Sequence, residues 1–151
     1  ALFGAAYFSR KYWAFIIPFV ALWLSDLVLN NTVYAEFYGG FYWGIHPGTY
    51  LGFAAVILLG ILLLRKVSVA NVFGASIGGA ILFFLISNFF VWMGSATYPQ
   101  NLPGLLAAYA AGIPFFWKTL AGFLLYSGLL FGGYEWAKQR WGFLALEKAE
   151  L

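Results

Sequence analysis

The chain has 151 residues, of which 64% are hydrophobic and 9% are charged, and it contains no cysteine. A soluble domain has about 25% charged residues, so this composition excludes a water-soluble globule, and the abundance of apolar side chains excludes a disordered chain. The lack of cysteine excludes a disulfide scaffold and a thiolate metal site. The net charge of +3 does not indicate nucleic-acid binding, because the cations lie at the ends of apolar runs. That pattern is typical of an integral membrane protein in a lipid bilayer.

Four apolar segments are long enough to cross a bilayer, whose hydrocarbon core of ~30 Å needs roughly 20 helical residues. They are residues 12–30, 47–64, 69–94 and 119–137. A β-barrel would need alternating strands, and runs such as ILLGILLL at 57–64 show no alternation. We therefore predict an all-α polytopic helical bundle forming a single domain over residues 1–151. Pro18 should kink the first span or mark its boundary.

Two further apolar stretches are too short to cross a bilayer by themselves. Residues 1–8 (ALFGAAYF) are followed closely by a basic pair, and we expect them to form the tail of a further helix. Residues 102–117 are bracketed by Pro103 and Pro114, which leave only about ten helical residues between them. We therefore predict that this second stretch is a re-entrant or interfacial helix.

The distribution of positive charge predicts the orientation of the chain. If the four spans cross and residues 102–117 do not, seven of the eight cationic side chains fall on one side, which is then cytoplasmic. These seven are Arg10, Lys11, Arg65, Lys66, Lys138, Arg140 and Lys148. If residues 102–117 crossed, the division would be five against three. We therefore predict a multi-pass membrane protein with a cytoplasmic C-terminus.

Two loops on the predicted outer side, residues 31–46 and 95–117, are rich in aromatic residues and contain no cation. Tyrosine and tryptophan rings commonly form a belt at the level of the lipid headgroups. The density of rings in the first loop also fits a lid over an apolar ligand pocket. On that second interpretation, the rings in and beside these loops that contact a ligand are Tyr34, Trp43, Trp92, Tyr98 and Tyr109.

Polar side chains inside membrane segments are costly to retain, so each is a candidate functional residue. Asp26 lies one turn before the outer end of the first span, where it either extends to the interface or pairs with Lys118 or a ligand group. Asn88 lies in the outer half of the third span, where it either forms an interhelical hydrogen bond or faces a pocket. Lys118, the one cation on the outer side, either reaches lipid headgroups or contacts a ligand. Together with Asn30, these residues form the polar part of the predicted substrate site.

The other ionisable residues have simpler interpretations. Glu36 should be solvated in its loop, and Glu135 should pair with Lys138 or Arg140. His46 is the one histidine of the chain, and a lone membrane histidine can ligate the metal of a chlorin or haem. Its place in a turn before a proline argues against that role, and we predict no cofactor and no metal site.

Small residues recur at four-residue spacing in two of the spans. They are Ala70, Gly74 and Gly78 in the third span and Gly128 and Gly132 in the last. Such spacing lets helix backbones approach closely. The stripe therefore predicts either packing within the chain or a docking surface for another membrane subunit.

The sequence contains no catalytic motif. There is no cysteine nucleophile, no nucleotide-binding glycine-rich loop, no H-E-x-x-H and no G-x-S-x-G. We therefore predict that the chain is not an enzyme, and that ATP-driven transport would require a partner chain.

Several segments resemble a family of uncharacterised small bacterial membrane proteins that are usually described as candidate transport proteins. They are ALFGAAYF with its basic pair, SDLVLNN, SNFFVW and YPQNLPGLLAAYAAGIPFFWKTLAGFLLYSGLLFGG, of which residues 113–120 are the most specific. The family is similar in architecture to the S components of energy-coupling-factor vitamin transporters. The resemblance implies a preceding N-terminal helix, a six-helix S-component-like topology and a location in the bacterial cytoplasmic (inner) membrane. This chain departs from the family where an acidic residue often follows the position of Gly122, because it has Phe123 there.

Two functions follow from these patterns. In the first, the chain is a substrate-capture subunit that binds a small, vitamin-like molecule at its outer face, through Asp26, Asn88, Lys118 and the aromatic rings. A motor subunit would then dock on the small-residue stripe. In the second, the chain is a non-catalytic accessory subunit of a larger photosynthetic or respiratory complex and packs against other chains, lipids or pigments. An outward-opening cavity favours the first function, and a filled core favours the second.

Overall fold

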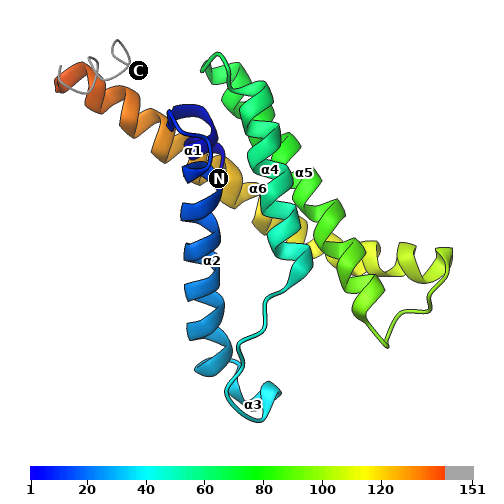
Figure 1. Cartoon of the computed structure of the whole chain (residues 1–151). Coiled ribbons are helices and arrows are strands. Elements are labelled where there is room, and N and C mark those ends of the chain that lie inside the picture. Colours follow the sequence, from blue (N-terminus) through cyan, green and yellow to red (C-terminus); the bar gives the residue numbers. More distant parts are fainter. Residues whose placement is uncertain (142–151) are drawn as a thin grey trace.

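The structure is a computed structural model that describes residues 1–141, apart from the side chains of Phe37 and Tyr38. Within this part of the chain there are six helices and no strands, which confirms the predicted all-α class (Figure 1). The helices are α1 (Leu2–Tyr7), α2 (Trp13–Asn31), α3 (Ala35–Tyr38), α4 (Pro47–Leu63), α5 (Val69–Gly94) and α6 (Leu102–Arg140).

The helices α2, α4 and α5 begin and end within one residue of the predicted segments. Local capping explains two of the starts. The Ser68 hydroxyl accepts a hydrogen bond from the Asn71 backbone N–H at 3.2 Å, and α4 begins with Pro47 in its first turn, where the missing N–H has no cost. The helix α2 continues through Pro18, so this proline does not mark a boundary.

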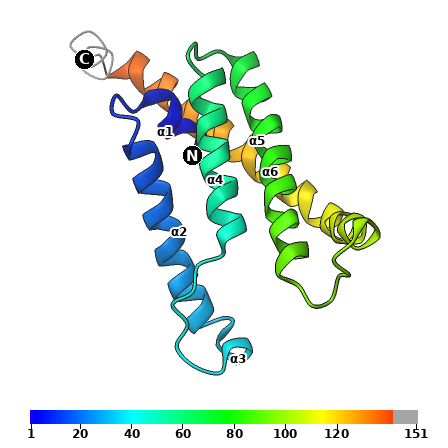
Figure 2. The ribbon, with the colours of Figure 1, turned by 45° about the vertical axis from the view of Figure 1, so that its right-hand side comes forward.

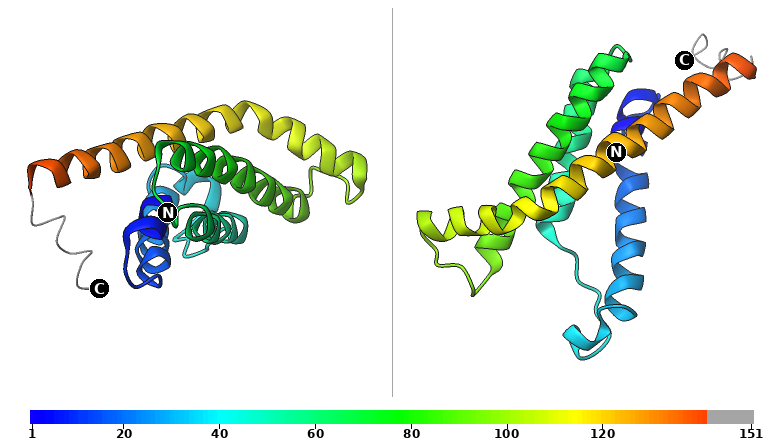
Figure 3. Two further views of the ribbon diagram at one scale, coloured as in Figure 1. Left: turned by 90° about the horizontal axis from the view of Figure 1, so that it is seen from above. Right: turned by 180° about the vertical axis from the view of Figure 1, so that it is seen from behind.

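The predicted break between a re-entrant helix at 102–117 and a span at 119–137 is wrong, because α6 is one helix of 39 residues. Pro114 lacks a backbone N–H, so one hydrogen bond of the helix is missing there. Such a loss bends a helix without ending it when the surrounding residues favour helix. Figure 3 shows the first turns of α6 inclined to the rest of the helix. At 1.5 Å per residue, α6 is about 58 Å long. It is therefore too long to lie entirely across ~30 Å of hydrocarbon.

The bundle is centred on α5, which packs against α4 on one side and α6 on the other (Figures 1 and 2). The short helix α1 lies against α4 and α6, and α2 contacts the rest more sparsely. Close approach depends on glycine, since a Cβ atom at Gly52 would come within 2.8 Å of the Phe83 ring. The two best-buried large side chains, Val56 and Ile57, are fully enclosed on α4. The core therefore surrounds α4, with buried residues from α1 and α5, Phe131 of α6 and Ala14 of α2.

The face of α5 that packs within the chain lies beside the predicted small-residue stripe. Its buried residues are Ala75, Ser76, Gly79 and Ala80. In the predicted stripe, Ala70, Gly74, Gly128 and Gly132 are exposed, and Gly78 alone approaches another helix, through Leu59. Small residues lie along two adjacent faces of α5, and their spacing alone does not indicate which face packs within the chain. The prediction that the stripe packs within the chain is therefore wrong for those four residues. The alternative, that it is a docking surface for another subunit, stays a prediction.

Large apolar side chains cover the outside of the helices. Three helices, α2, α5 and α6, are long and apolar enough to cross a membrane, and α4 is apolar but shorter, with 17 residues. At 1.5 Å per residue, α4 measures about 25 Å. Exposed residues such as Leu62, Leu106 and Leu129 would be unfavourable in water and favourable in lipid. These features are compatible with a helical membrane protein.

The long helices alternate in direction, so the chain has two distinct ends (Figures 1 and 2). We call one the basic end, where the α1–α2 turn, the α4–α5 turn and the end of α6 lie. It carries Arg10, Lys11, Arg65, Lys66, Lys138 and Arg140. We call the other the aromatic end, formed by residues 32–46 and 95–101. Six of the seven cations predicted to share a side thus lie at one end, and the seventh, Lys148, is outside the described residues. Which end faces the cytoplasm stays a prediction.

Candidate functional site

The end of α2 and the start of α4 hold a polar cluster around Asp26. Tyr50, in the first turn of α4, donates its hydroxyl to the Asp26 Oδ2 atom at 3.4 Å. His46, just before α4, places its Nδ1 atom 3.9 Å from the same oxygen. The predicted alternative partner, Lys118, does not pair with Asp26 in the part of the chain that the structure describes. We call Asp26, Asn30, His46 and Tyr50 the Asp26 cluster.

The Asp26 carboxylate is only loosely held. Its side chain is 22% exposed, and a partly desolvated charge is unfavourable unless strong hydrogen bonds compensate. Both of its contacts are longer than the usual 2.5–3.0 Å of a hydroxyl bond or ~2.8 Å of a charge-assisted bond. An ionised carboxylate has about four acceptor positions. Asp26 therefore retains the capacity to accept further donors.

Asn30 adds an unused donor to the same face of α2. It lies four residues after Asp26, a spacing that places two side chains on one helix face. Asn30 is 5% exposed, and its Nδ2 atom has no hydrogen-bond partner among the described residues. An unsatisfied buried donor costs about 1–3 kcal/mol. A carboxylate acceptor and a free amide donor therefore lie one helical turn apart.

Asn31 fixes the loop beside this cluster, a role that sequence reasoning missed. Its Nδ2 atom donates to the carbonyls of Leu27 at 2.8 Å and Tyr42 at 3.0 Å, and its Oδ1 atom accepts from the Tyr42 N–H at 2.8 Å. The Tyr42 ring lies 6.3 Å from the His46 ring. The adjacent Asn30 and Asn31 indicate a polar helix end in the sequence. Nothing near them in the sequence indicates that Asn31 bonds to Tyr42, eleven residues later.

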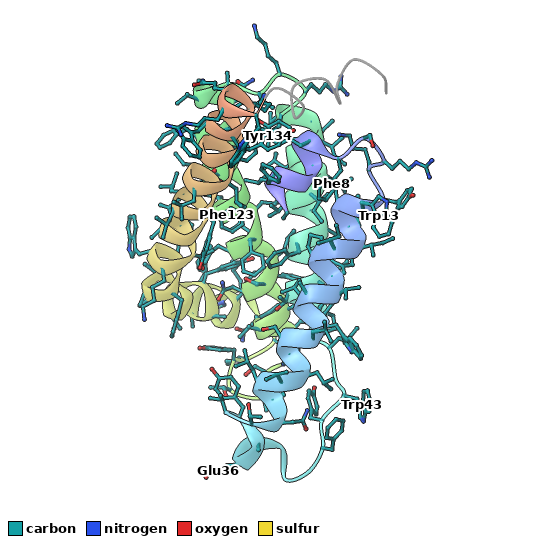
Figure 4. The ribbon with its side chains drawn as sticks, turned by 90° about the vertical axis from the view of Figure 1, so that its left-hand side faces the viewer. Phe8, Trp13, Glu36, Trp43, Phe123 and Tyr134 are labelled. Carbon is teal, nitrogen blue, oxygen red and sulfur yellow. The ribbon has the colours of Figure 1, made fainter. Side chains whose placement is uncertain are left out.

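Three aromatic side chains of the loop at 32–46, Tyr34, Phe41 and Trp43, are exposed. Trp43 stacks on Trp23 of α2 with the ring centroids 6.4 Å apart, and Phe41 packs edge-on against Trp43 at 4.9 Å. Trp43 is 64% exposed, and Tyr34 is also exposed. Figure 4 shows Trp43 projecting outward at the same end as Glu36. Phe41 and Trp43 thus pack on α2 through Trp23, and an aromatic belt or a lid over a ligand stays a prediction.

Asn88 and Tyr109 form contacts between α5 and α6. The Asn88 Nδ2 atom donates to the Phe84 carbonyl on its own helix at 2.9 Å, and Gly112 packs closely against the other side-chain atom, Oδ1. The Tyr109 hydroxyl donates across the interface to the Leu85 carbonyl at 2.9 Å. Both side chains therefore stabilise helix packing.

Trp92 also forms structural contacts, in the turn between α5 and α6. Its indole N–H donates to the Pro99 carbonyl at 2.9 Å, and Gln100 donates to the Trp92 carbonyl at 2.8 Å. Tyr98 is half-buried in this turn. Lys118 is exposed and forms no hydrogen bond or ion pair with any residue that the structure describes.

The structure thus divides the predicted polar site. Asp26 and Asn30 lie together on α2, and Asn88 is engaged between α5 and α6. No hydrogen bond or ion pair among residues 1–141 joins either of the first two to Asn88 or Lys118. The described residues also contain no group of three His, Cys, Asp or Glu side chains that could hold a metal ion.

The basic end has a polar cluster of its own. Glu135 accepts a hydrogen bond from the Tyr7 hydroxyl at 2.5 Å and pairs with Lys138 at 2.6 Å, which confirms the predicted pairing. The Lys138 ammonium also lies 5.8 and 5.3 Å from the ring centres of Tyr7 and Tyr134. These contacts tie α1 to the end of α6, near Tyr134 and Phe8 in Figure 4.

Two cavities lie away from the Asp26 cluster. One, of about 440 Å³, is apolar and is lined by α1, α4, α5 and α6, including Phe3, Phe83 and Phe123. The second, of about 780 Å³, lies between α5 and α6 at the basic end. Phe123, where the chain departs from the family it resembles, therefore makes the wall of the first cavity apolar.

One family matches nearly the whole chain. It is described as a "Family of unknown function (DUF6580)", and the match covers residues 1–146. No curated protein and no solved structure matches the chain. The match agrees with the resemblance to an uncharacterised family, and transport and an S-component role remain predictions.

Proposed function

The chain belongs to this family of unknown function, and we propose that it is a membrane transport protein whose aromatic end captures a small, partly apolar molecule. The Asp26 cluster would hold the polar part of that molecule, in the manner of an S component. The observation that carries the proposal is the weakly held Asp26 carboxylate, with partners at 3.4 and 3.9 Å. Evolution rarely keeps an ionisable group in a membrane helix without a role.

The chemistry of the cluster defines what it would bind. Asp26 accepts hydrogen bonds and attracts positive charge, whereas the buried Asn30 amide N–H needs an acceptor. The proposed ligand therefore carries a donor or cationic group close to a carbonyl, hydroxyl or ring nitrogen. Trp23 lies three residues before Asp26 on α2, a spacing that places both on one helix face, and with Trp43 stacked on it, it offers apolar surface there.

The proposal replaces two of the four polar residues first assigned to the site. Asn88 already donates to Phe84 and packs against Gly112, and Lys118 is exposed. Tyr50 and His46 take their place, because both contact Asp26.

The test is to purify the protein gently from its native membrane and to identify the small molecules that co-purify by mass spectrometry. Asp26→Asn should lose at least one compound that the unchanged protein retains, by roughly tenfold or more, the effect of losing a charge-assisted hydrogen bond. The matched control is Glu36→Gln, because Glu36 is an exposed acid at the same end. Equal retention in both variants would contradict the proposal.

A second function, as an accessory subunit of a larger membrane complex, has one observation in its favour. Of the 19 residues of α2, only Ala14 and Asn30 are buried, and Gly74, Gly128 and Gly132 have nothing packed against them. Such surfaces suit contact with another chain. Stoichiometric co-purification of other membrane proteins, with no small molecule, would favour this second function.

A further inference from the structure

The cavity between α5 and α6 is an amphipathic groove. The two helices diverge towards the basic end (Figures 1 and 3), and the cavity between them, about 780 Å³, is in the range of ligand pockets of ~300–1,000 Å³. Its walls are mainly apolar, with Val72, Phe73, Leu124 and Phe131, and three serines also line it. We call this cavity the basic groove.

The rim of the basic groove carries unused positive charge. Arg65 and Lys66, in the α4–α5 turn, are exposed, and their side chains form no hydrogen bond or ion pair with the described residues. Lys138, on the opposite wall, is already paired with Glu135. The groove therefore has an excess of two positive charges at one end.

The other basic pair at this end is used differently. Lys11 donates to the Ala5 carbonyl at 3.0 Å, and Arg10 contacts the Tyr12 hydroxyl at 3.3 Å. Arg140 lies over the Trp136 ring at 5.2 Å. Among the described cations at the basic end, Arg65 and Lys66 are thus the two beside the groove whose side chains have no hydrogen bond, ion pair or ring contact. Gly128 and Gly132 keep its α6 wall open, because a Cβ atom at either would meet nothing within 4 Å.

We propose that the basic groove binds an anionic phospholipid, with an acyl chain along the apolar walls and the phosphate at Arg65 and Lys66. Basic pockets between membrane helices suit anionic headgroups, and each nearby Lys or Arg contributes about 1 kcal/mol. A second copy of the chain is a poor occupant, since a symmetric contact would bring four unpaired cations together. A soluble phosphate compound would leave the apolar walls unused.

The test uses the purified full chain in nanodiscs with equal amounts of phosphatidylglycerol and phosphatidylcholine, followed by native mass spectrometry. The unchanged protein should retain phosphatidylglycerol selectively. The double variant Arg65→Gln with Lys66→Gln should lose that selectivity by roughly tenfold or more. The charge-matched control, Arg10→Gln with Arg140→Gln, removes two cations that do not line the groove and should keep the selectivity.

A second pair of variants tests the shape of the groove without changing charge. Gly132→Leu fills the groove and should displace the lipid, whereas Gly133→Leu, on the neighbouring position outside the groove, should not. The proposal is overturned if the unchanged protein retains both lipids equally. It is also overturned if the two charge variants behave alike, or if a second copy of the chain occupies the groove without lipid. Asp26→Asn should leave lipid retention unchanged, so this result is independent of the proposed function.

Discussion

Two carboxylates near the ends of long helices, Glu135 on α6 at the basic end and Asp26 on α2 at the aromatic end, have opposite surroundings. At the basic end, Glu135 has a hydroxyl at 2.5 Å and an ammonium at 2.6 Å. At the aromatic end, Asp26 has a hydroxyl at 3.4 Å and an imidazole at 3.9 Å. A carboxylate with short contacts is satisfied by the fold, whereas one with long contacts keeps acceptor capacity for something else. On the proposed function, Glu135 stabilises the fold and Asp26 binds the ligand.

The largest expected effect in this comparison is on binding at Asp26. Asp26→Asn should reduce the co-purified compound roughly 10- to 100-fold, because it removes a charged acceptor. The thermal midpoint should change little, since asparagine keeps the side chain polar and removes a partly desolvated charge. A large loss of thermal stability in Asp26→Asn, with unchanged compound, would reverse the roles assigned to the two carboxylates.

Substitutions of the adjacent Asn30 and Asn31 should change the stability of the aromatic end in opposite directions. Asn31→Leu removes three hydrogen bonds, so it should destabilise the protein by about 2 kcal/mol and expose residues 32–46 to proteolysis. Asn30→Leu removes an unsatisfied buried donor and should be neutral or stabilising by about 1 kcal/mol, while weakening ligand retention. Chemical unfolding in detergent and limited proteolysis would check both. Equal destabilisation by the two substitutions would show that Asn30 is satisfied.

Glu135→Gln should cost about 1 kcal/mol, because it weakens the contacts to Tyr7 and Lys138 at a half-exposed position. Its thermal midpoint should fall by a few degrees while the co-purified compound stays bound. Tyr7→Phe, which removes one of the two partners, should show a smaller fall. Loss of the compound in Glu135→Gln would break the distinction between the two ends.

The smallest effect is expected at Lys118. Its side chain is exposed and has no partner among the described residues, so Lys118→Gln should change stability by less than about 0.5 kcal/mol. Compound retention should equal that of the unchanged protein. A tenfold loss of retention would restore Lys118 to the site.

Most of the fold follows from the apolar runs in the sequence. The bounds of α2, α4 and α5 follow from hydrophobic length and from caps such as Ser68. The continuity of α6 does not, because Pro114 ends some helices and only bends others, and the packing around it decides. The register of the α5 interface also depends on which face meets Val56 and Phe123, which the spacing of small residues does not specify.

The candidate site was only half predictable. Asp26 and Asn30 stand out because polar residues in an apolar helix are costly. Their neighbours Tyr50 and His46 lie on another element, and only the packing of α2 beside α4 identifies them. Asn88 has the same sequence signal as Asp26, yet a contact with its own helix satisfies it.

The comparison of the two ends requires that they lie on opposite sides of a membrane, with the aromatic end outside. The chain has no cysteine, so single substitutions give clean labelling sites at exposed positions. In intact cells, a membrane-impermeant maleimide should label Glu36→Cys, and it should label Lys66→Cys only after the cells are permeabilised. The reverse pattern, or labelling of both positions in intact cells, would contradict the account.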